Sequence, residues 1–266
     1  MNILPVIKWT VIPSLWERLL RRVNSALICL LLCFSYGAQA GTLSIIGQSR
    51  WVNVAYIFDG DTFRTRSGER IRLLGINTPE VAHNAQAPQA YAKEAKRRLK
   101  QLILGKSVRL RLDKEKRDKY GRTLAQVYLR DGRWVNQIMV DEGLAHVYTF
   151  APNFYWADAL LRTEQAARRD MRGLWKSSRF RILDASAISP RHIGQFRLVR
   201  GYARAAQSWR FRLGKTLNIS VPRKYRPWFT AADLPHNGQK VIVRGVIRAS
   251  STGSLYLALH SPFDMR

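Results

Sequence analysis

Two carboxylates flank a glycine in the tetrapeptide Asp-Gly-Asp-Thr at residues 59–62. The stretches on both sides have strand-like composition, so the tetrapeptide is expected to form a tight turn. Hard cations such as Ca²⁺ bind carboxylate and carbonyl oxygens in this kind of arrangement. An Asp-Gly pair is also a common hairpin signal, so this turn taken alone favours a structural role over a metal site.

A second candidate is Arg72, which lies inside the apolar run at residues 71–74. A guanidinium buried without a partner would be costly, so Arg72 is expected to meet a carboxylate or an anion. The same strand is followed by a Pro turn that presents Glu80, and a carboxylate there can accept a proton from a water molecule. The structural alternatives are a salt-bridged strand arginine and a helix-capping glutamate.

A third group is the pentapeptide Asp-Lys-Tyr-Gly-Arg at residues 118–122, which ends in a second arginine, Arg122. A guanidinium group meets carboxylate or phosphate oxygens with paired hydrogen bonds, so this turn could bind an anion. A solvated basic turn is the alternative for this segment alone.

The elements that would position these residues follow from the spacing of apolar side chains. Strands are predicted over residues 51–58, 61–66, 69–76, 107–112 and 123–129. A helix is predicted between Pro88 and Gly105, with one apolar face made by Ala92, Ala95, Leu99, Leu102 and Ile103. Two more helices are predicted over residues 135–142 and 157–172. Five strands with appended helices predict a β-barrel of the OB type in an α+β domain over residues 41–176.

A change of composition divides the rest of the chain. Residues 177–195 are predicted to be a linker, because they are rich in turn formers and lack apolar periodicity. Strands are predicted over residues 196–204, 207–213, 216–221, 240–248 and 254–260. They predict a second, smaller OB-like barrel over residues 196–266, a type that commonly binds single-stranded nucleic acid. The alternative is a structural barrel whose basic edge strands prevent pairing with other chains.

The net charge of the chain is strongly positive. It is +27, from 45 Lys and Arg residues against 18 Asp and Glu residues. Such an excess favours a polyanionic partner, because each phosphate contact releases condensed counterions. Charge that keeps an exported protein soluble, or that attracts it to anionic lipids, would be the alternatives.

Residues 1–40 are predicted to be a signal peptide. Arginines precede an apolar run at residues 26–34, and the small residues Ala38 and Ala40 suit a cleavage site. The run is short for a membrane span, which favours cleavage and export to the periplasm or the outside over an N-terminal anchor. Both cysteines, Cys29 and Cys33, lie in this run, so disulfides and thiolate metal sites are not expected in the chain after residue 40.

Taken together, five short motifs resemble the staphylococcal nuclease (thermonuclease) family in order and spacing. They lie at residues 59–62, 71–74, 78–80, 118–122 and 135–136, and the resemblance covers about residues 54–175. It implies an OB-type barrel and a Ca²⁺-dependent hydrolase that cuts phosphodiester bonds of DNA, RNA or both with little sequence preference.

The resemblance also implies a role for individual residues. The metal ligands would be Asp61, Asn77 and the backbone carbonyl of Thr78, with Asp59 in the outer shell. The catalytic residues would be Glu80, as the general base, and the phosphate-binding Arg72 and Arg122. The substrate-binding residues would be Lys119, Tyr120 and Tyr148.

One position departs from the family pattern, because Asn77 stands where the family usually has an Asp. An amide oxygen can still bind Ca²⁺, but the site loses a formal charge, so weaker Ca²⁺ binding is expected. The main alternative to the enzyme is therefore an impaired nuclease-like module that binds nucleic acid without cutting it. A third hypothesis is a protein that adheres to acidic polymers. A monomer without stable membrane association after signal cleavage is expected.

Overall fold

The computed structural model describes residues 49–80 and 89–266 of the chain. The predicted signal peptide lies outside these residues. Contacts hold Gly47–Arg266 together as one compact unit. In the part of the chain that the structure describes, none of the helices combines the length and the apolar character needed to cross a bilayer.

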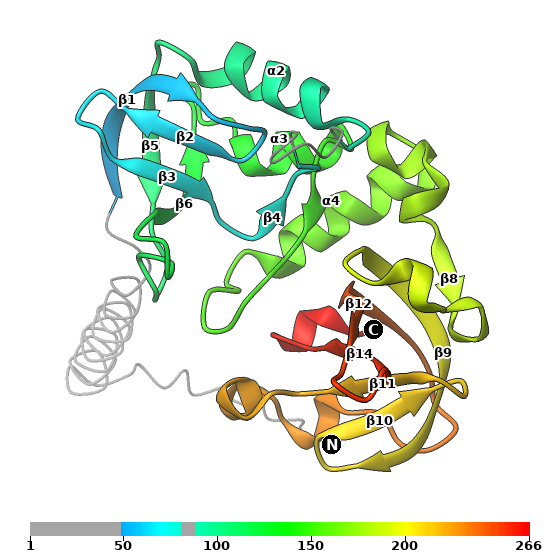
Figure 1. Cartoon of the computed structure of the whole chain (residues 1–266). Helices are drawn as coiled ribbons and strands as arrows, with labels where there is room; N and C mark the ends of the chain where they lie inside the picture. The colour runs from blue at the N-terminus through cyan, green and yellow to red at the C-terminus, as the bar shows by residue number, and fades with distance from the viewer. Residues whose placement is uncertain (1–48, 81–88) are drawn as a thin grey trace, which may run out of the picture. The chain divides into compact units, whose positions relative to one another are not determined.

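The first half of this unit is a closed five-stranded barrel (Figure 1). Its strands, in spatial order, are β1 (Ser49–Ile57), β2 (Thr62–Thr65), β3 (Arg70–Leu73), β6 (Thr123–Tyr128) and β5 (Ser107–Arg111). All neighbours are antiparallel except β3 and β6, which run parallel. Alternate side chains of β5 point into the core, including Val108 and Leu110. The prediction of a small barrel of the OB type is confirmed.

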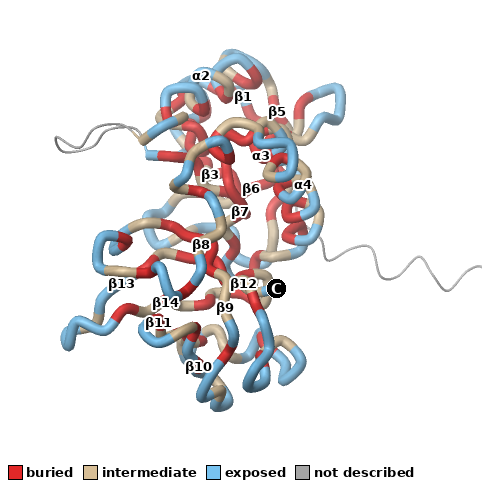
Figure 2. Tube along the Cα trace, turned by 90° about the vertical axis from the view of Figure 1, so that its right-hand side faces the viewer, coloured by how far each residue is buried: buried red, intermediate tan, exposed pale blue. Residues whose placement is uncertain are grey.

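Three helices accompany the barrel: α2 (Ala92–Ile103), α3 (Val135–Asp141) and α4 (Ala157–Arg169). The buried side of α2 consists of the five apolar residues that the periodicity predicts. The helix ends before Gly105, whose φ of 73° lies in the left-handed region that glycine adopts without strain. Figure 2 shows the exposed outer side of α2.

A short two-stranded sheet lies next to the barrel and is not evident from the sequence. β4 (Ile76–Asn77) pairs antiparallel with β7 (His146–Val147), which places Asn77 opposite His146. The backbone N–H of Tyr148 then donates to the Gly75 carbonyl at 2.9 Å. This pairing brings two chain segments, about seventy residues apart in the sequence, to the same edge of the molecule.

The second half contains a seven-stranded sheet. Along its main path the order is β12 (Lys240–Val246), β9 (Phe196–Gln207), β10 (Arg210–Leu213), β11 (Leu217–Ser220), β14 (Leu255–Ala258) and β13 (Arg248–Ala249). The seventh strand, β8 (Ile182–Asp184), pairs parallel with β9 and lies inside the segment expected to be a linker. The five strands predicted here correspond to β9, β10, β11, β12 and β14. That the sheet forms an OB-like barrel remains a prediction.

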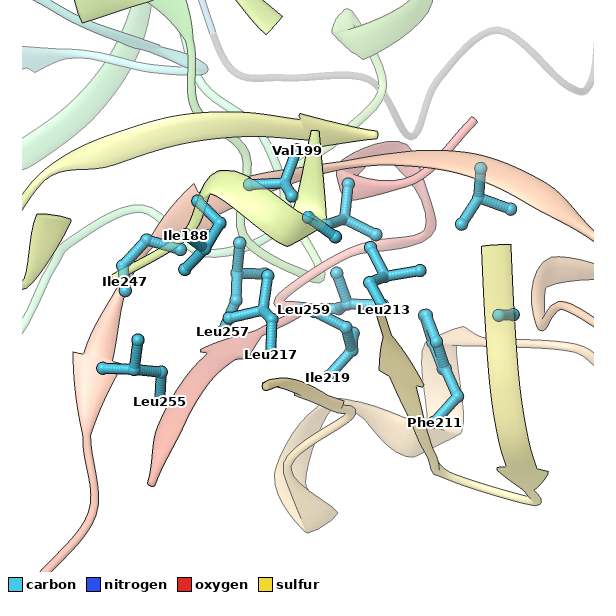
Figure 3. Packing of buried hydrophobic residues seen from close by; sticks show 14 of the residues in the cluster. Ile188, Val199, Phe211, Leu213, Leu217, Ile219, Ile247, Leu255, Leu257 and Leu259 are labelled. Carbon is cyan, nitrogen blue, oxygen red and sulfur yellow. The ribbon is translucent and has the colours of Figure 1, made fainter. Parts of the chain in front are cut away.

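The seven-stranded sheet packs around its own apolar core, which Figure 3 shows from close by. Its fully buried members include Val199, Leu213 and Leu257. A second cluster joins this sheet to the helical part of the barrel, because Phe196 and Leu198 of β9 pack with Leu174 and Trp175. The two halves therefore share buried apolar surface.

Candidate active site

Asp61 ties the turn after β1 to the segment after β4. Its carboxylate is buried, and Oδ2 accepts hydrogen bonds from the backbone N–H of Thr78 at 2.8 Å and from the Thr78 hydroxyl at 3.0 Å. Its Oδ1 accepts from the Thr62 hydroxyl at 3.1 Å. Two of the predicted metal ligands, Asp61 and Thr78, are thus fixed side by side.

Gly60 is required by close packing at this turn. A Cβ atom at position 60 would lie 2.6 Å from Cβ of Ala95 on α2 and 2.8 Å from Cγ2 of Thr78. Real Cβ atoms do not approach other heavy atoms this closely. The glycine therefore allows the acidic turn to sit between helix α2 and Thr78, a constraint that a simple hairpin would not have.

Arg72 has the carboxylate partner that its place in an apolar strand predicts. Its Nη2 lies 3.1 Å from Oδ2 of Asp61 and donates to Oδ1 of Asn77 at 2.9 Å, while Nη1 donates to the Leu73 carbonyl at 2.8 Å. The amide Nδ2 of Asn77 donates to the Thr78 carbonyl at 3.1 Å. Asn77 therefore links Arg72 to the carbonyl that was predicted to be a metal ligand, which an Asp could not do.

Asp59 and Asp61 form an acidic pair in which the two carboxylates repel each other. Burial and the nearby charge of Asp61 raise the pKa of Asp59 to about 6, although its Oδ1 accepts a hydrogen bond from the backbone N–H of Asp61. Within the described residues, no group of three His, Cys, Asp or Glu side chains is placed to hold a metal. A cation here would rely on the two carboxylates and on the neutral oxygens of Asn77 and Thr78. That all-oxygen donor set fits Ca²⁺. It carries less negative charge than a site in which an Asp replaced Asn77.

Arg122 reaches the same site from the loop before β6. Its Nε and Nη2 both lie 2.7 Å from Oδ2 of Asp118, and its Nη1 donates to the Thr62 hydroxyl at 3.5 Å. Oδ1 of Asp118 also accepts from the backbone N–H groups of Tyr120 and Arg122. These bonds fold the loop so that the Arg122 guanidinium lies next to Thr62, whose hydroxyl donates to Asp61.

Lys119 and Tyr120 lie on the outer edge of this loop. The Tyr120 side chain is 70% exposed, and its ring has Nζ of Lys119 at 4.9 Å and Cζ of Arg122 at 5.4 Å from its centroid. An exposed ring with two cations beside it can stack on a base while the cations meet phosphates. The structure keeps both residues near Arg122 but outside the buried network around Asp61.

Glu80 and Tyr148 line a cavity of about 230 Å³, together with Asn77 and Thr78. Glu80 is exposed, and its carboxylate has no hydrogen bond or ion pair with any residue that the structure describes. Tyr148 is half-buried beside Phe150, at 4.8 Å between ring centroids, and burial raises the pKa of its phenol. The nine residues predicted from the sequence thus gather around one edge of the barrel. Four of them line this cavity: Asn77, Thr78, Glu80 and Tyr148.

Other lining residues were missed by the sequence interpretation. Those that lie outside the barrel strands include His146, Arg179, Phe180, Gly194, Phe196 and Val246. Several of them follow the barrel region, in the predicted linker or the seven-stranded sheet. The signal that could have identified them is local: residues 179–181 alternate arginine with phenylalanine inside a segment otherwise rich in turn formers.

Comparison with known proteins agrees with this architecture. A family model described as staphylococcal nuclease homologue matches residues 70–177. The chain is 37% identical over 147 residues to endonuclease YncB of Bacillus subtilis (strain 168), an alignment that covers 53% of this chain and 69% of that protein. It is 28% identical over 155 residues to the thermonuclease of Staphylococcus hyicus, covering 56% and 91%. It is 39% identical over 129 residues to an uncharacterized endonuclease of Escherichia coli, covering 47% and 76%. This chain belongs to the staphylococcal nuclease family.

Proposed function

We propose that the protein is an exported, Ca²⁺-dependent nuclease that hydrolyses phosphodiester bonds of DNA, RNA or both with little sequence preference. The observation that carries the proposal is the arrangement around Asp61. A buried carboxylate is tied to Thr78 and Arg72, and the adjoining cavity is lined by Glu80, whose carboxylate is exposed. Relatives named endonuclease and thermonuclease support the same activity.

Two arginines are suited to bind the phosphate that is cut. Arg72 is held by Asp61, Asn77 and the backbone, so its positive charge is fixed before any substrate arrives. Arg122 is held by Asp118 and extends Nη1 toward Thr62. Preorganised guanidinium groups stabilise the charge that develops on phosphate oxygens, since they need not reorient during the reaction.

Glu80 is suited to be the general base. Its exposed carboxylate can accept a proton from the attacking water. Asp61, Asn77 and the Thr78 carbonyl would hold Ca²⁺, which when bound would neutralise phosphate charge and position the water. Because only Asp59 and Asp61 bring negative charge, we expect the affinity for Ca²⁺ to be lower than in relatives with a further Asp.

The second candidate function is binding of nucleic acid without cleavage. It is favoured by Asn77, whose side chain is engaged with Arg72 and with the Thr78 carbonyl. If those bonds persist when Ca²⁺ is offered, the Asn77 Oδ1 and the Thr78 carbonyl each have one lone pair left for the metal, which weakens coordination. Retention of Glu80 and both arginines favours the enzyme.

The seven-stranded sheet is suited to bind a single strand. Arg204 of β9 and Arg212 of β10 are exposed and lie directly opposite each other, an unfavourable pairing unless an anion neutralises it. Tyr202, on the same side of β9 two residues before Arg204, is 55% exposed and has Nζ of Lys240 at 5.9 Å from its ring centroid. An exposed ring between cations suits base stacking next to phosphate contacts.

Export is proposed on the sequence of residues 1–40, and a monomer is expected to be the active form. The cleavage assay should use residues 41–266, single- and double-stranded DNA and RNA, a Ca²⁺ titration and a chelator. We expect cleavage that the chelator abolishes. A complete lack of chelator-sensitive cleavage at every Ca²⁺ concentration would refute the enzyme and leave the binding-only function.

The base assignment is tested by Glu80→Gln. Loss of a general base lowers turnover by about 10²- to 10⁴-fold, and substrate binding should change little. Glu94→Gln is the matched control, because it removes the same charge from an exposed position on α2. Equal losses of turnover and binding in the Glu80 variant would contradict its role as base.

A further inference from the structure

The cavity next to Glu80 has a second wall that comes from outside the barrel. One wall is the segment with Asn77, Thr78 and Glu80. Arg179 and Phe196 belong to the other wall, and both follow the stretch that the family model matches. Neither phosphate-binding arginine of the barrel lines the cavity, whereas Arg179 does.

The Arg179 side chain has no hydrogen-bond or ion-pair partner among residues 49–80 and 89–266. Its Nε is buried without a hydrogen bond, and its guanidinium has no ion pair with any residue that the structure describes. Cζ of Arg179 lies 6.0 Å from the centroid of the Phe180 ring. Burial lowers the pKa of Arg179, as expected for a cation withdrawn from water without a carboxylate. The buried Nε–H group without an acceptor has a desolvation cost, which an anionic ligand in the cavity would offset.

The neighbours of Arg179 add positive charge and fix its backbone. Arg197 of β9 is buried, donates from Nη1 to the Arg179 carbonyl and from Nη2 to Oε1 of Gln195 at 2.5 Å. Burial and the charges of Arg179 and Arg191 lower the pKa of Arg197. Like charges held this closely make the edge of the cavity attractive to an anion.

We propose that Arg179 binds a backbone phosphate adjacent to the one that is cut, so that the cavity is a substrate subsite shared by the barrel and the seven-stranded sheet. The inference rests on the proposed nuclease function. The ligand is a strand with at least two phosphodiester groups. The phosphate differs from the scissile one because neither Arg72 nor Arg122 lines the cavity: Arg72 meets the lining only through Asn77, and Arg122 is bonded to Asp118 and Thr62.

The first test compares two substrates in Arg179→Gln and in the control Arg181→Gln, both in the chain of residues 41–266. Arg181 is exposed and does not line this cavity. Loss of a charged hydrogen bond should raise KM about tenfold for a single-stranded hexanucleotide, with kcat nearly unchanged. A dinucleoside monophosphate, which has one phosphodiester, should be cut at the wild-type rate by every variant. Equal effects on both substrates, or none on either, would overturn the proposal.

The second test does not depend on cleavage. In the Glu80→Gln background, binding of the hexanucleotide is measured against salt concentration. Arg179→Gln should reduce the slope of log K against log salt by about 0.7, the value for one single-strand phosphate contact, and Arg179→Lys should restore it. An unchanged slope would overturn the subsite. If the wild-type protein cuts nothing, the nuclease proposal fails while this slope still tests Arg179.

Discussion

The ion pair between Glu164 and Arg244 is buried, so removal of either partner alone should strongly destabilise the molecule. Glu164 of α4 is 1% exposed and Arg244 of β12 is 7% exposed. Their two hydrogen bonds are 2.8 and 2.6 Å long, and Oε2 of Glu164 also accepts from the backbone N–H of Val147 at 3.3 Å. The pair therefore joins the barrel's last helix, strand β7 and the seven-stranded sheet.

Removal of one partner would leave the other charge buried and unpaired. Such losses cost about 3–5 kcal/mol, whereas replacement of both partners by apolar residues of similar size is often close to neutral. We therefore expect Glu164→Met and Arg244→Met each to lower the free energy of unfolding by about 3 kcal/mol. The double replacement of Glu164 and Arg244 by Met should cost far less than the sum of the single changes.

Urea denaturation of the four proteins gives these free energies and closes a double-mutant cycle. The exposed pair of Asp131 and Arg133, with side chains 52% and 60% exposed, is the control, and Asp131→Asn should leave the urea midpoint nearly unchanged. Single costs below 1 kcal/mol at Glu164 and Arg244, or strict additivity in the double variant, would refute the reasoning.

Three further outcomes are expected. Asn77→Asp adds a carboxylate to the acidic pair and should lower the Ca²⁺ concentration for half-maximal cleavage roughly tenfold; an unchanged midpoint would show that Asn77 is not a ligand. Burial and the positive charges beside it lower the pKa of His260 from 6.5 to about 4. Below about pH 6.5 the unfolded chain therefore binds a proton at His260 that the folded protein does not bind. The free energy of unfolding falls as the pH is lowered from 6.5 to 4. In His260→Phe, thermal unfolding against pH should show that fall reduced by about 2 kcal/mol, after allowance for partial exposure; an identical pH profile would contradict this. Replacement of Arg204 and Arg212 by Gln should reduce the salt slope of single-strand binding by about 0.7 per residue, and an unchanged slope would leave that face without its proposed role.

Much of the barrel could be predicted from the sequence, because its signals are local. Side-chain alternation in β5 and the single apolar face of α2 appear directly in the spacing of residues. Arg72 was expected to need an acidic partner simply because it interrupts an apolar strand, and Asp61 is that partner. Such inferences depend on the residues within one helix or strand and not on the side chains that pack against it.

The structure of the second half was less accessible. Turn formers at residues 177–195 suggested a linker, yet β8 lies there and pairs with β9, and Arg179 lies in the cavity next to Glu80. A strand of three residues has too little periodicity to be recognised when its stability comes from the neighbour it pairs with.

The residue types of the site, the barrel and the strongly basic charge could all be read from the sequence, since they follow from composition and local spacing. Three contacts became visible only in the folded molecule: Asn77 bridges Arg72 and Thr78, β4 pairs with β7, and Glu164 pairs with Arg244, eighty residues away. Periodicity shows which side of an element is buried. It does not show which distant side chain is buried against it, because that choice depends on how whole elements pack together.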